Sequence, residues 1–128
     1  MRYFVCLTAA TAVVLGAAST QAAAKGPAFQ LNSTTWSFVD PDKKVKAVES
    51  IDSDGNYIEN AATGKHLDHG TAVMKDGKAC FTSAMTKEGE VCWSTSPVKI
   101  GHSLKTVSNK GEKLKVTRVA YVKLSMPK

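Results

Sequence analysis

The chain has 128 residues, of which 43% are hydrophobic, and it carries 17 Lys and Arg against 11 Asp and Glu. This length is enough for one domain and too short for two. The sequence has no internal repeat and no low-complexity segment.

The N-terminal segment has the organisation of a secretory signal peptide. Arg2 precedes an apolar run over residues 3–18, and a tail of small residues follows. One positive charge, a short apolar run and an Ala-x-Ala-like cleavage site are typical of such a peptide. We therefore predict a signal peptide over 1–24 and a single periplasmic or secreted domain over 25–128. A retained membrane anchor is the alternative, which the short apolar run disfavours.

The predicted export determines how the cysteines are interpreted. Cleavage would remove Cys6 and leave Cys80 and Cys92, and an even number in an exported chain indicates a disulfide. Closing this loop should stabilise the fold by about 3 kcal/mol in the chain-entropy model. A redox-active pair would need a spacing such as Cys-x-x-Cys, which is absent. We therefore predict a structural disulfide.

The remainder predicts an all-β protein. No stretch after residue 25 shows sustained helical periodicity, whereas short runs of Val, Thr, Ile and aromatic residues alternate with Gly, Asp, Asn and Pro. In chain order the predicted strands are 34–39, 45–51, 56–59, 69–75, 78–83, 90–94, 103–108 and 113–124. About eight strands joined by short connections predict a small antiparallel up-and-down barrel, which removes the exposed edges of an open sheet.

Two connections stand out along this series. Asp76-Gly77 lies between strand-like segments and predicts a two-residue hairpin turn with positive φ at both positions. Residues 61–68 form the longest polar connection, which we expect to be a loop. On the next hairpin each cysteine is followed by an aromatic residue, Phe81 or Trp93, and alternation puts these rings on the face opposite the cysteines.

The first and last strands carry a pair of residues that would meet if the barrel closes. Arg118 shares an alternation phase with Leu114 and Val116, unless a bulge near Thr117 turns it outward. Facing inward on the last strand, Arg118 would lie beside Trp36 of the first, and a cation–π contact there would contribute about 0.5–2 kcal/mol.

This pair resembles one in the lipocalin-like, or calycin, barrels. That family has a tryptophan early in its first strand and an arginine late in its last strand that packs across it. The resemblance implies the fold and does not imply a particular ligand. Thr34 stands where the family has a glycine two residues before the tryptophan.

Two histidines form a candidate metal site. His66 and His69 are three residues apart with a carboxylate between them, and Met74 and Met85 follow. Such ligands suit a soft metal such as copper. Exposed loop histidines are the other interpretation, and it is the one that the predicted loop favours.

Basic residues cluster toward the C-terminus. Lys113, Lys115 and Lys123 occupy the outward phase of the last predicted strand, with Tyr121 among them. This stripe is a candidate surface for an anionic envelope polymer or an acidic protein. A solvated face that keeps the protein soluble is the alternative.

No residue pattern indicates catalysis or a cofactor. The chain lacks a nucleophile elbow, a His-Glu-x-x-His motif and a phosphate-binding glycine loop. Its paired acids, Asp40/Asp42 and Asp52/Asp54, are expected to form turns. We therefore predict a small exported binding protein without enzymatic activity, stable membrane anchor or nucleic-acid partner. Its partner would be a protein, an envelope polymer or a small apolar ligand, and a metal-handling protein using His66 and His69 is the alternative.

Overall fold

The computed structural model describes residues 29–127, and the predicted signal peptide lies outside them. The described part is all-β, as predicted, and contains eight strands. They are β1 (Thr34–Val39), β2 (Lys46–Ile51), β3 (Asn56–Ala61), β4 (His66–Lys75), β5 (Lys78–Ser83), β6 (Glu90–Ser94), β7 (Ser103–Val107) and β8 (Lys113–Val119). Within residues 29–127, no helix is long and apolar enough to cross a membrane.

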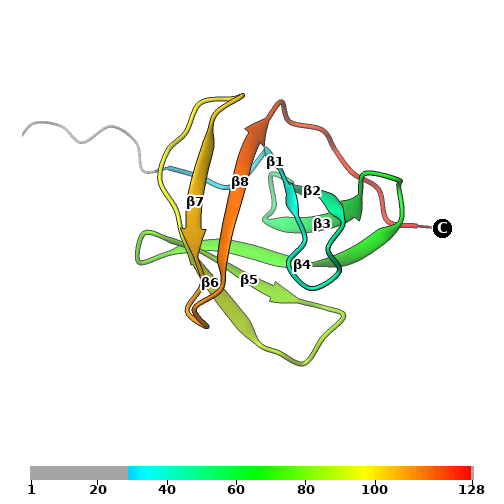
Figure 1. The fold of residues 1–128 in the computed structure, drawn as a ribbon, viewed down its shortest axis with the longest axis horizontal. Coiled ribbons are helices and arrows are strands. Elements are labelled where there is room, and N and C mark those ends of the chain that lie inside the picture. The colour runs from blue at the N-terminus through cyan, green and yellow to red at the C-terminus, as the bar shows by residue number, and fades with distance from the viewer. Residues whose placement is uncertain (1–28, 128) are drawn as a thin grey trace, which may run out of the picture.

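The strands form one antiparallel sheet that curls into a nearly closed barrel (Figure 1). Its order is β6-β5-β4-β3-β2-β1-β8-β7, so neighbours in the chain are neighbours in the sheet, and β1 also pairs with β8. The two ends of this order, β6 and β7, meet at a seam. A single bridge there joins Trp93 to Ser108, and the Ser94 hydroxyl accepts a hydrogen bond from the Val107 N–H.

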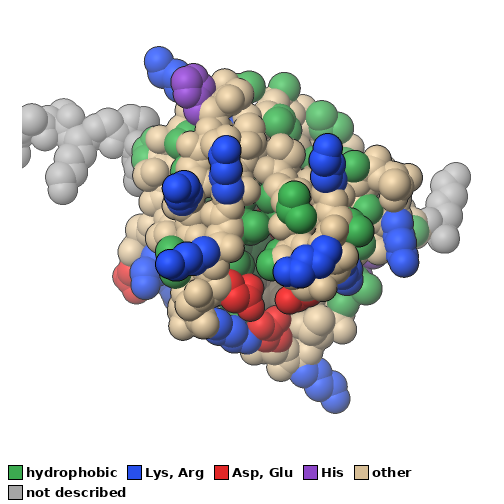
Figure 2. Space-filling view, viewed as in Figure 1, with side chains coloured by type: hydrophobic (Ala, Val, Ile, Leu, Met, Phe, Trp, Pro, Cys, Tyr) green, Lys and Arg blue, Asp and Glu red, His purple; other side chains and the backbone are tan. Residues whose placement is uncertain are grey.

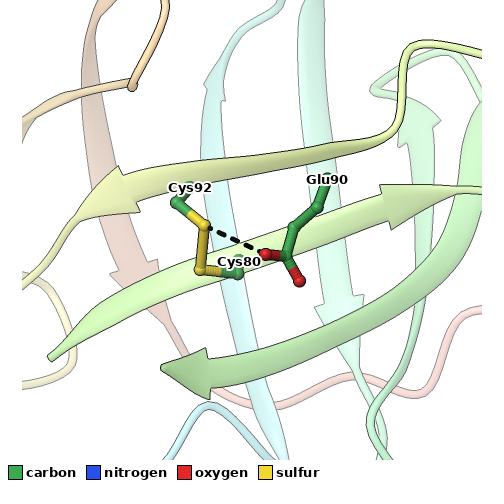
Figure 3. A group of neighbouring side chains, drawn as sticks. All are labelled: Cys80, Glu90 and Cys92. Atoms are coloured by element: carbon green, nitrogen blue, oxygen red, sulfur yellow. Dashed lines mark hydrogen bonds between the residues drawn. A yellow bond between two sulfur atoms is a disulfide. The ribbon is translucent and has the colours of Figure 1, made fainter. Parts of the chain in front are cut away.

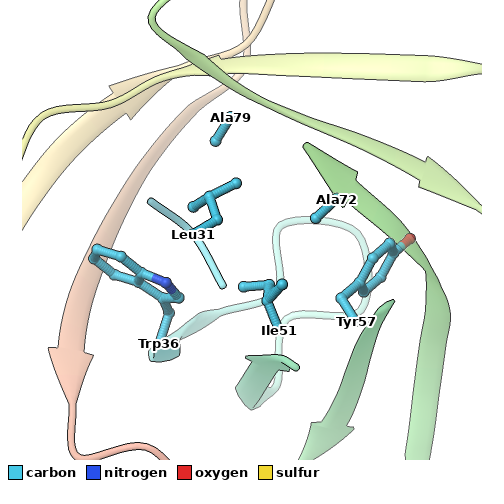
Figure 4. Close-up of a cluster of buried hydrophobic side chains, with 6 residues drawn as sticks. All are labelled: Leu31, Trp36, Ile51, Tyr57, Ala72 and Ala79. Atoms are coloured by element: carbon cyan, nitrogen blue, oxygen red, sulfur yellow. The ribbon is translucent and has the colours of Figure 1, made fainter. Parts of the chain in front are cut away.

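Alternation along the strands separates a core face from an outer face. Six buried side chains form the main core cluster: Leu31, Trp36, Ile51, Tyr57, Ala72 and Ala79 (Figure 4). Most come from alternate positions of β1 to β5, because successive residues of a strand point to opposite faces. Leu31 comes from the segment before β1 and reaches into the same cluster. The N-terminal segment therefore closes one end of the barrel.

Arg118 and Trp36 lie opposite one another in the β1–β8 ladder, as predicted. The guanidinium, however, does not stack on the indole. It lies over the ring of Phe29, 5.9 Å from the centroid, and Phe29 packs edge-on against Trp36 with ring centroids 6.2 Å apart. Arg118 Nη1 also donates a hydrogen bond to the Val98 carbonyl at 3.0 Å. The arginine thus helps to close this end of the barrel through an intervening ring.

Three sequence expectations need correction, two about strand limits and one about a bulge. Strand β4 begins at His66, so much of the expected 61–68 loop is strand, and a register shift between Glu59 and Asn60 accommodates it. Strand β8 ends at Val119 rather than at residue 124. No register shift occurs along the β1–β8 or β7–β8 ladders, so the bulge considered near Thr117 is absent there.

The segment after β8 crosses the outer face of the first two strands. Val122 accepts a hydrogen bond at its carbonyl from the Ser50 hydroxyl and donates its N–H to the Thr35 hydroxyl. These contacts bury Thr35 completely. Hydrogen bonds with polar side chains of β1 and β2 therefore hold the C-terminal segment against these strands, and the last strand ends before it.

The predicted hairpin and disulfide are both present. Asp76 and Gly77 have φ values of 51° and 73°, as the two-residue turn requires. Cys80 and Cys92 occupy opposed positions on β5 and β6 and are bonded (Figure 3). The bond is consistent with an oxidising, exported compartment.

The aromatic residues beside the cysteines are diagonal neighbours rather than opposed. Phe81 faces Val91 and Trp93 faces Ala79 across the β5–β6 ladder. Both rings lie on the face opposite the disulfide, as the alternation predicted.

Gly70 allows β4 and β5 to approach closely. A Cβ atom at this position would lie 2.0 Å from the carbonyl oxygen of Thr82, well inside van der Waals contact. Only glycine fits here, since the obstructing atom belongs to the backbone of the neighbouring strand.

Candidate functional site

A cavity of about 190 Å³ lies inside the barrel. The end closed by Leu31 and Trp36 is apolar, whereas acidic side chains gather toward the opposite end, where the β1–β2, β5–β6 and β7–β8 connections lie. Figure 2 shows acidic side chains gathered in a hollow, with hydrophobic side chains inside it and basic ones around it. The cavity therefore has two chemically distinct ends.

The distribution of charge in the cavity is one-sided. Within residues 29–127, the residues that line it include seven of the eleven acids of the chain and no lysine or arginine. These acids are Asp40, Asp42, Glu49, Glu59, Asp68, Glu88 and Glu112. Although the protein is basic overall, most of its acids are concentrated in the interior and at the mouth of the barrel.

Three of these acids form a row across neighbouring strands. Glu49 on β2 lies opposite Glu59 on β3, and Glu59 lies opposite Asp68 on β4. On the other side Glu49 lies opposite Trp36 of β1. Directly opposed side chains in an antiparallel ladder have Cβ atoms about 5 Å apart, and like charges in such positions are destabilising. The sheet itself thus holds three carboxyl groups together beside an indole ring.

Glu59 is the most deeply buried of the three, with only 7% of its surface exposed. Burial and a hydrogen bond with Asp40 raise the pKa of Glu59 to about 9. Its Oε1 atom has no hydrogen-bond partner in the described part of the chain. Glu59 is therefore protonated at neutral pH, and its Oε1 atom is available to accept a hydrogen bond from a ligand.

Asp40 is the ionised member of this pair. Burial alone would raise the pKa of Asp40, but the hydrogen bond with Glu59 and two backbone donors lower it. Those donors are the N–H groups of Asp42 and Lys43, 2.9 and 2.8 Å from Asp40 Oδ1. The turn expected at Asp40 and Asp42 thus also fixes a carboxylate at the rim of the cavity.

Asp68 is held by three hydrogen bonds. Tyr57 donates its hydroxyl to Oδ2 at 2.8 Å, and Oδ1 accepts from the Ser83 hydroxyl at 2.6 Å and the His69 N–H at 2.9 Å. Burial, and then the hydrogen bond to Asp68, raise the pKa of Tyr57. The phenol therefore stays protonated and orients Asp68.

Glu49 completes the row and is half-buried. Burial, followed by repulsion from Asp68 and Asp40, raises the pKa of Glu49 to about 8. The cavity thus contains carboxyl groups whose pKa values are raised, first by burial and then by their acidic neighbours.

His66 and His69 meet on the outer surface of the barrel. His66 Nε2 and His69 Nδ1 are 3.0 Å apart, and His66 Nδ1 lies 2.8 Å from Asn60 Oδ1. Burial and the neighbouring His69 lower the pKa of His66. The expectation of loop histidines is wrong, because both belong to β4. Neither Met74, which packs against the core, nor Met85, which is exposed, is seen in contact with the pair.

The residues of the predicted basic stripe are divided between two elements. Lys113 and Lys115 are exposed on β8, whereas Tyr121 and Lys123 are exposed on the segment that follows it. Lys115 lies opposite Lys105 of β7, which adds a further cation to the outer face. The structure does not test the role of this stripe, which stays a prediction.

Glu90 lies beside the disulfide, with its Oε1 atom 3.6 Å from Cys92 Sγ (Figure 3). A disulfide sulfur has no proton to donate, so this is a simple contact. Bonded sulfurs are not thiolate ligands either, so the oxidised group offers no metal site. Glu90 instead pairs with Lys75 at 3.0 Å.

Sequence reasoning missed the acidic interior of the barrel. A usable signal was present in the strands, because Glu49 alternates with Ala47 and Ile51, and Glu59 alternates with Tyr57 and Ala61. Continuing the apolar phase through these acids places them inside the barrel.

No protein-family model, curated protein or solved structure matches this chain.

Proposed function

We propose that this protein is a small exported binding barrel, of lipocalin-like architecture, that holds a small ligand in its interior cavity. The observation that carries the proposal is a cavity with an apolar inner end and an acidic outer end. Concave sites lined by apolar and aromatic side chains, with a few convergent polar groups, are the usual form of small-molecule sites. The disulfide supports an extracytoplasmic location.

The size of the cavity limits the ligand to about one ring. A volume of about 190 Å³ exceeds the roughly 150 Å³ of an engineered cavity that holds benzene. A ligand of about nine heavy atoms, contributing about 0.5 kcal/mol each, would bind with a Kd of roughly 0.5 mM. The cavity therefore supports interior capture of such a compound more than recognition of a partner by the outer basic stripe.

The two tryptophans of the chain report occupancy directly, because both Trp36 and Trp93 line the cavity. We expect 2-phenylethanol, a neutral one-ring probe, to shift both indole N–H resonances saturably in the mature protein. An absence of saturable shifts at both indoles, at concentrations up to about 10 mM, would contradict interior binding.

A variant that fills the cavity provides the control. Leu114 lines the cavity, so Leu114→Phe should weaken binding of 2-phenylethanol. Val73 points away from it and is 52% exposed, so Val73→Phe adds a ring of the same size outside and should leave binding unchanged. Equal affinity in both variants would place the probe elsewhere on the protein.

A metal site at His66 and His69 is the second candidate function. Two nitrogen ligands at about 2.05 Å from a metal and at right angles to each other are about 2.9 Å apart, close to the observed 3.0 Å. Asn60 accepts from the other ring nitrogen of His66, as outer partners of metal-binding histidines often do.

Titration with Cu²⁺ tests this site. Binding should be lost in His66→Ala and kept in His102→Ala, which removes an exposed histidine outside the pair. Equal binding by the two variants would exclude the pair as the metal site.

A further inference from the structure

The cavity chemistry points to a class of ligand, and this inference rests on the proposed function. We propose that the barrel selects a small organic cation, a protonated amine carried on an aromatic or other apolar body, with Glu59 as its principal carboxyl ligand. The apolar part would occupy the end near Trp36, and the ammonium group would lie among the carboxyl groups.

The row of acids is the first support. Glu49, Glu59 and Asp68 occupy directly opposed positions on three neighbouring strands, although like charges in such positions weaken a sheet. The free protein avoids this repulsion at neutral pH because Glu59 keeps its proton, at a cost in free energy. A cation placed among the three carboxyl groups would favour their ionised forms, so an arrangement that is unfavourable in the empty protein would be favourable in the complex.

The unpartnered oxygen of Glu59 is an independent support. Glu59 is more than nine-tenths buried, lines the cavity and has no hydrogen-bond partner at Oε1. A buried polar atom without a partner is costly, and an ammonium N–H group is a donor that would satisfy it. Asp68, by comparison, is already satisfied by three donors from the protein.

The described residues place no cation of their own in the cavity. Lys43 interacts electrostatically with Asp40, and its Nζ atom donates to the Leu67 carbonyl at 3.0 Å. Lys110 pairs with Glu88 at the rim. Among the residues that the structure describes, no lysine, arginine or histidine lines the cavity.

The aromatic lining favours an organic cation over a bare metal ion. Trp36 lies opposite Glu49 in the β1–β2 ladder, and Tyr57 and Phe81 pack edge to face with ring centroids 5.3 Å apart. Faces of aromatic rings attract ammonium groups and also contact their hydrocarbon portions. A hydrated metal ion would use neither property.

Binding should also release protons. The ammonium group would favour the ionised form of Glu59, whose pKa lies above neutrality in the free protein because of burial and Asp40. Affinity should therefore increase from pH 6 to pH 8. The charged or titratable groups around Glu59 are Asp40, Lys43, Glu49, Tyr57 and Asp68, with Glu88, Lys110 and Glu112 toward the mouth.

The test compares three probes of matched shape: 2-phenylethylamine, 2-phenylethanol and phenylacetate. We expect the amine to bind at least about tenfold more tightly than the alcohol, because a charge-assisted hydrogen bond contributes about 1.5–3 kcal/mol. The carboxylate should bind more weakly than the alcohol. In Glu59→Gln the amine should lose its advantage, while the alcohol should bind as in the wild type.

The control is Glu90→Gln, which makes the same change of charge on the outer face and should alter neither affinity. Equal binding of amine and alcohol to the wild type would overturn this inference and leave the proposed function intact. Binding of none of the probes would overturn both. Displacement of the amine by Ca²⁺ alone, with loss of Ca²⁺ binding in Glu59→Gln, would assign the acids to a metal ion and overturn the inference.

Discussion

Replacing Glu59 by glutamine should stabilise the protein at neutral pH. The carboxyl group has a pKa of about 9 in the fold, because of burial and the hydrogen bond with Asp40, against an ordinary value of 4.5. The folded state therefore binds more protons than the unfolded state between these values. Its stability contribution is complete below about pH 4.5 and is lost progressively as the pH rises toward 9.

The size of the expected stability gain follows from the difference between the pH and the ordinary pKa of Glu59. pH 7 lies about 2.5 pH units above the ordinary Glu59 pKa of 4.5. Keeping the carboxyl group protonated in the fold at this pH therefore costs about 3 kcal/mol. Glutamine has no proton to lose, and its amide can donate to Asp40 as the protonated carboxyl does. We therefore expect Glu59→Gln to gain up to about 3 kcal/mol at pH 7 and almost nothing at pH 4.

Urea unfolding followed by tryptophan fluorescence at pH 4, 5.5, 7 and 8.5 measures both the gain and its pH dependence. Glu90→Gln is the control, since it removes an exposed carboxyl group from the outer face. A Glu59→Gln variant that is less stable than the wild type at every pH would refute the reasoning. So would a wild-type stability that rises between pH 5.5 and 8.5.

Three further changes test other parts of the fold. Reducing the bond between Cys80 and Cys92 should lower the Tm by more than ~10 °C, and titration of two free thiols in the native protein would contradict the disulfide. Gly70→Ala should cost about 3 kcal/mol in urea unfolding, because the new methyl group collides with the backbone of β5, and a cost below ~1 kcal/mol would show that the strands separate easily. Arg118→Ala should cost about 1–3 kcal/mol through lost packing on Phe29, and a change below ~0.5 kcal/mol would mean that the guanidinium is only a surface group.

The strands were predictable because local signals are strong here. β1, β5 and β6 have the predicted limits, and the Asp76-Gly77 turn has the expected backbone conformation. The order of the sheet followed from short connections, which join neighbouring antiparallel strands. Closure between β1 and β8 followed from the need to remove edges.

The misjudged limits depend on contacts between distant residues. The polar residues at the start of β4 have a composition typical of a loop. They nevertheless pair with β3 through a register shift, which the local sequence does not indicate. The last strand stops early because Val122 bonds to Thr35 and Ser50 instead of continuing the ladder. Tertiary contacts determine both outcomes, so propensity alone could not predict them.

The candidate site was harder to predict than the fold. Its acids are far apart in sequence, and only the register of β2, β3 and β4 shows that Glu49, Glu59 and Asp68 are opposed. The net charge of +6 instead favours the lysines of the outer face as a candidate site, because composition does not show which residues face the interior.

The seam between β6 and β7 gives the barrel a preferred place to open. The other seven junctions are ladders of at least three residue pairs, whereas this one depends on a single bridge and on hydrogen bonds that involve side chains such as Ser94. Separating it exposes Trp93 and the cavity wall without breaking any ladder. Because Cys80 and Cys92 bond β5 to β6, these two strands would move together if the seam separated.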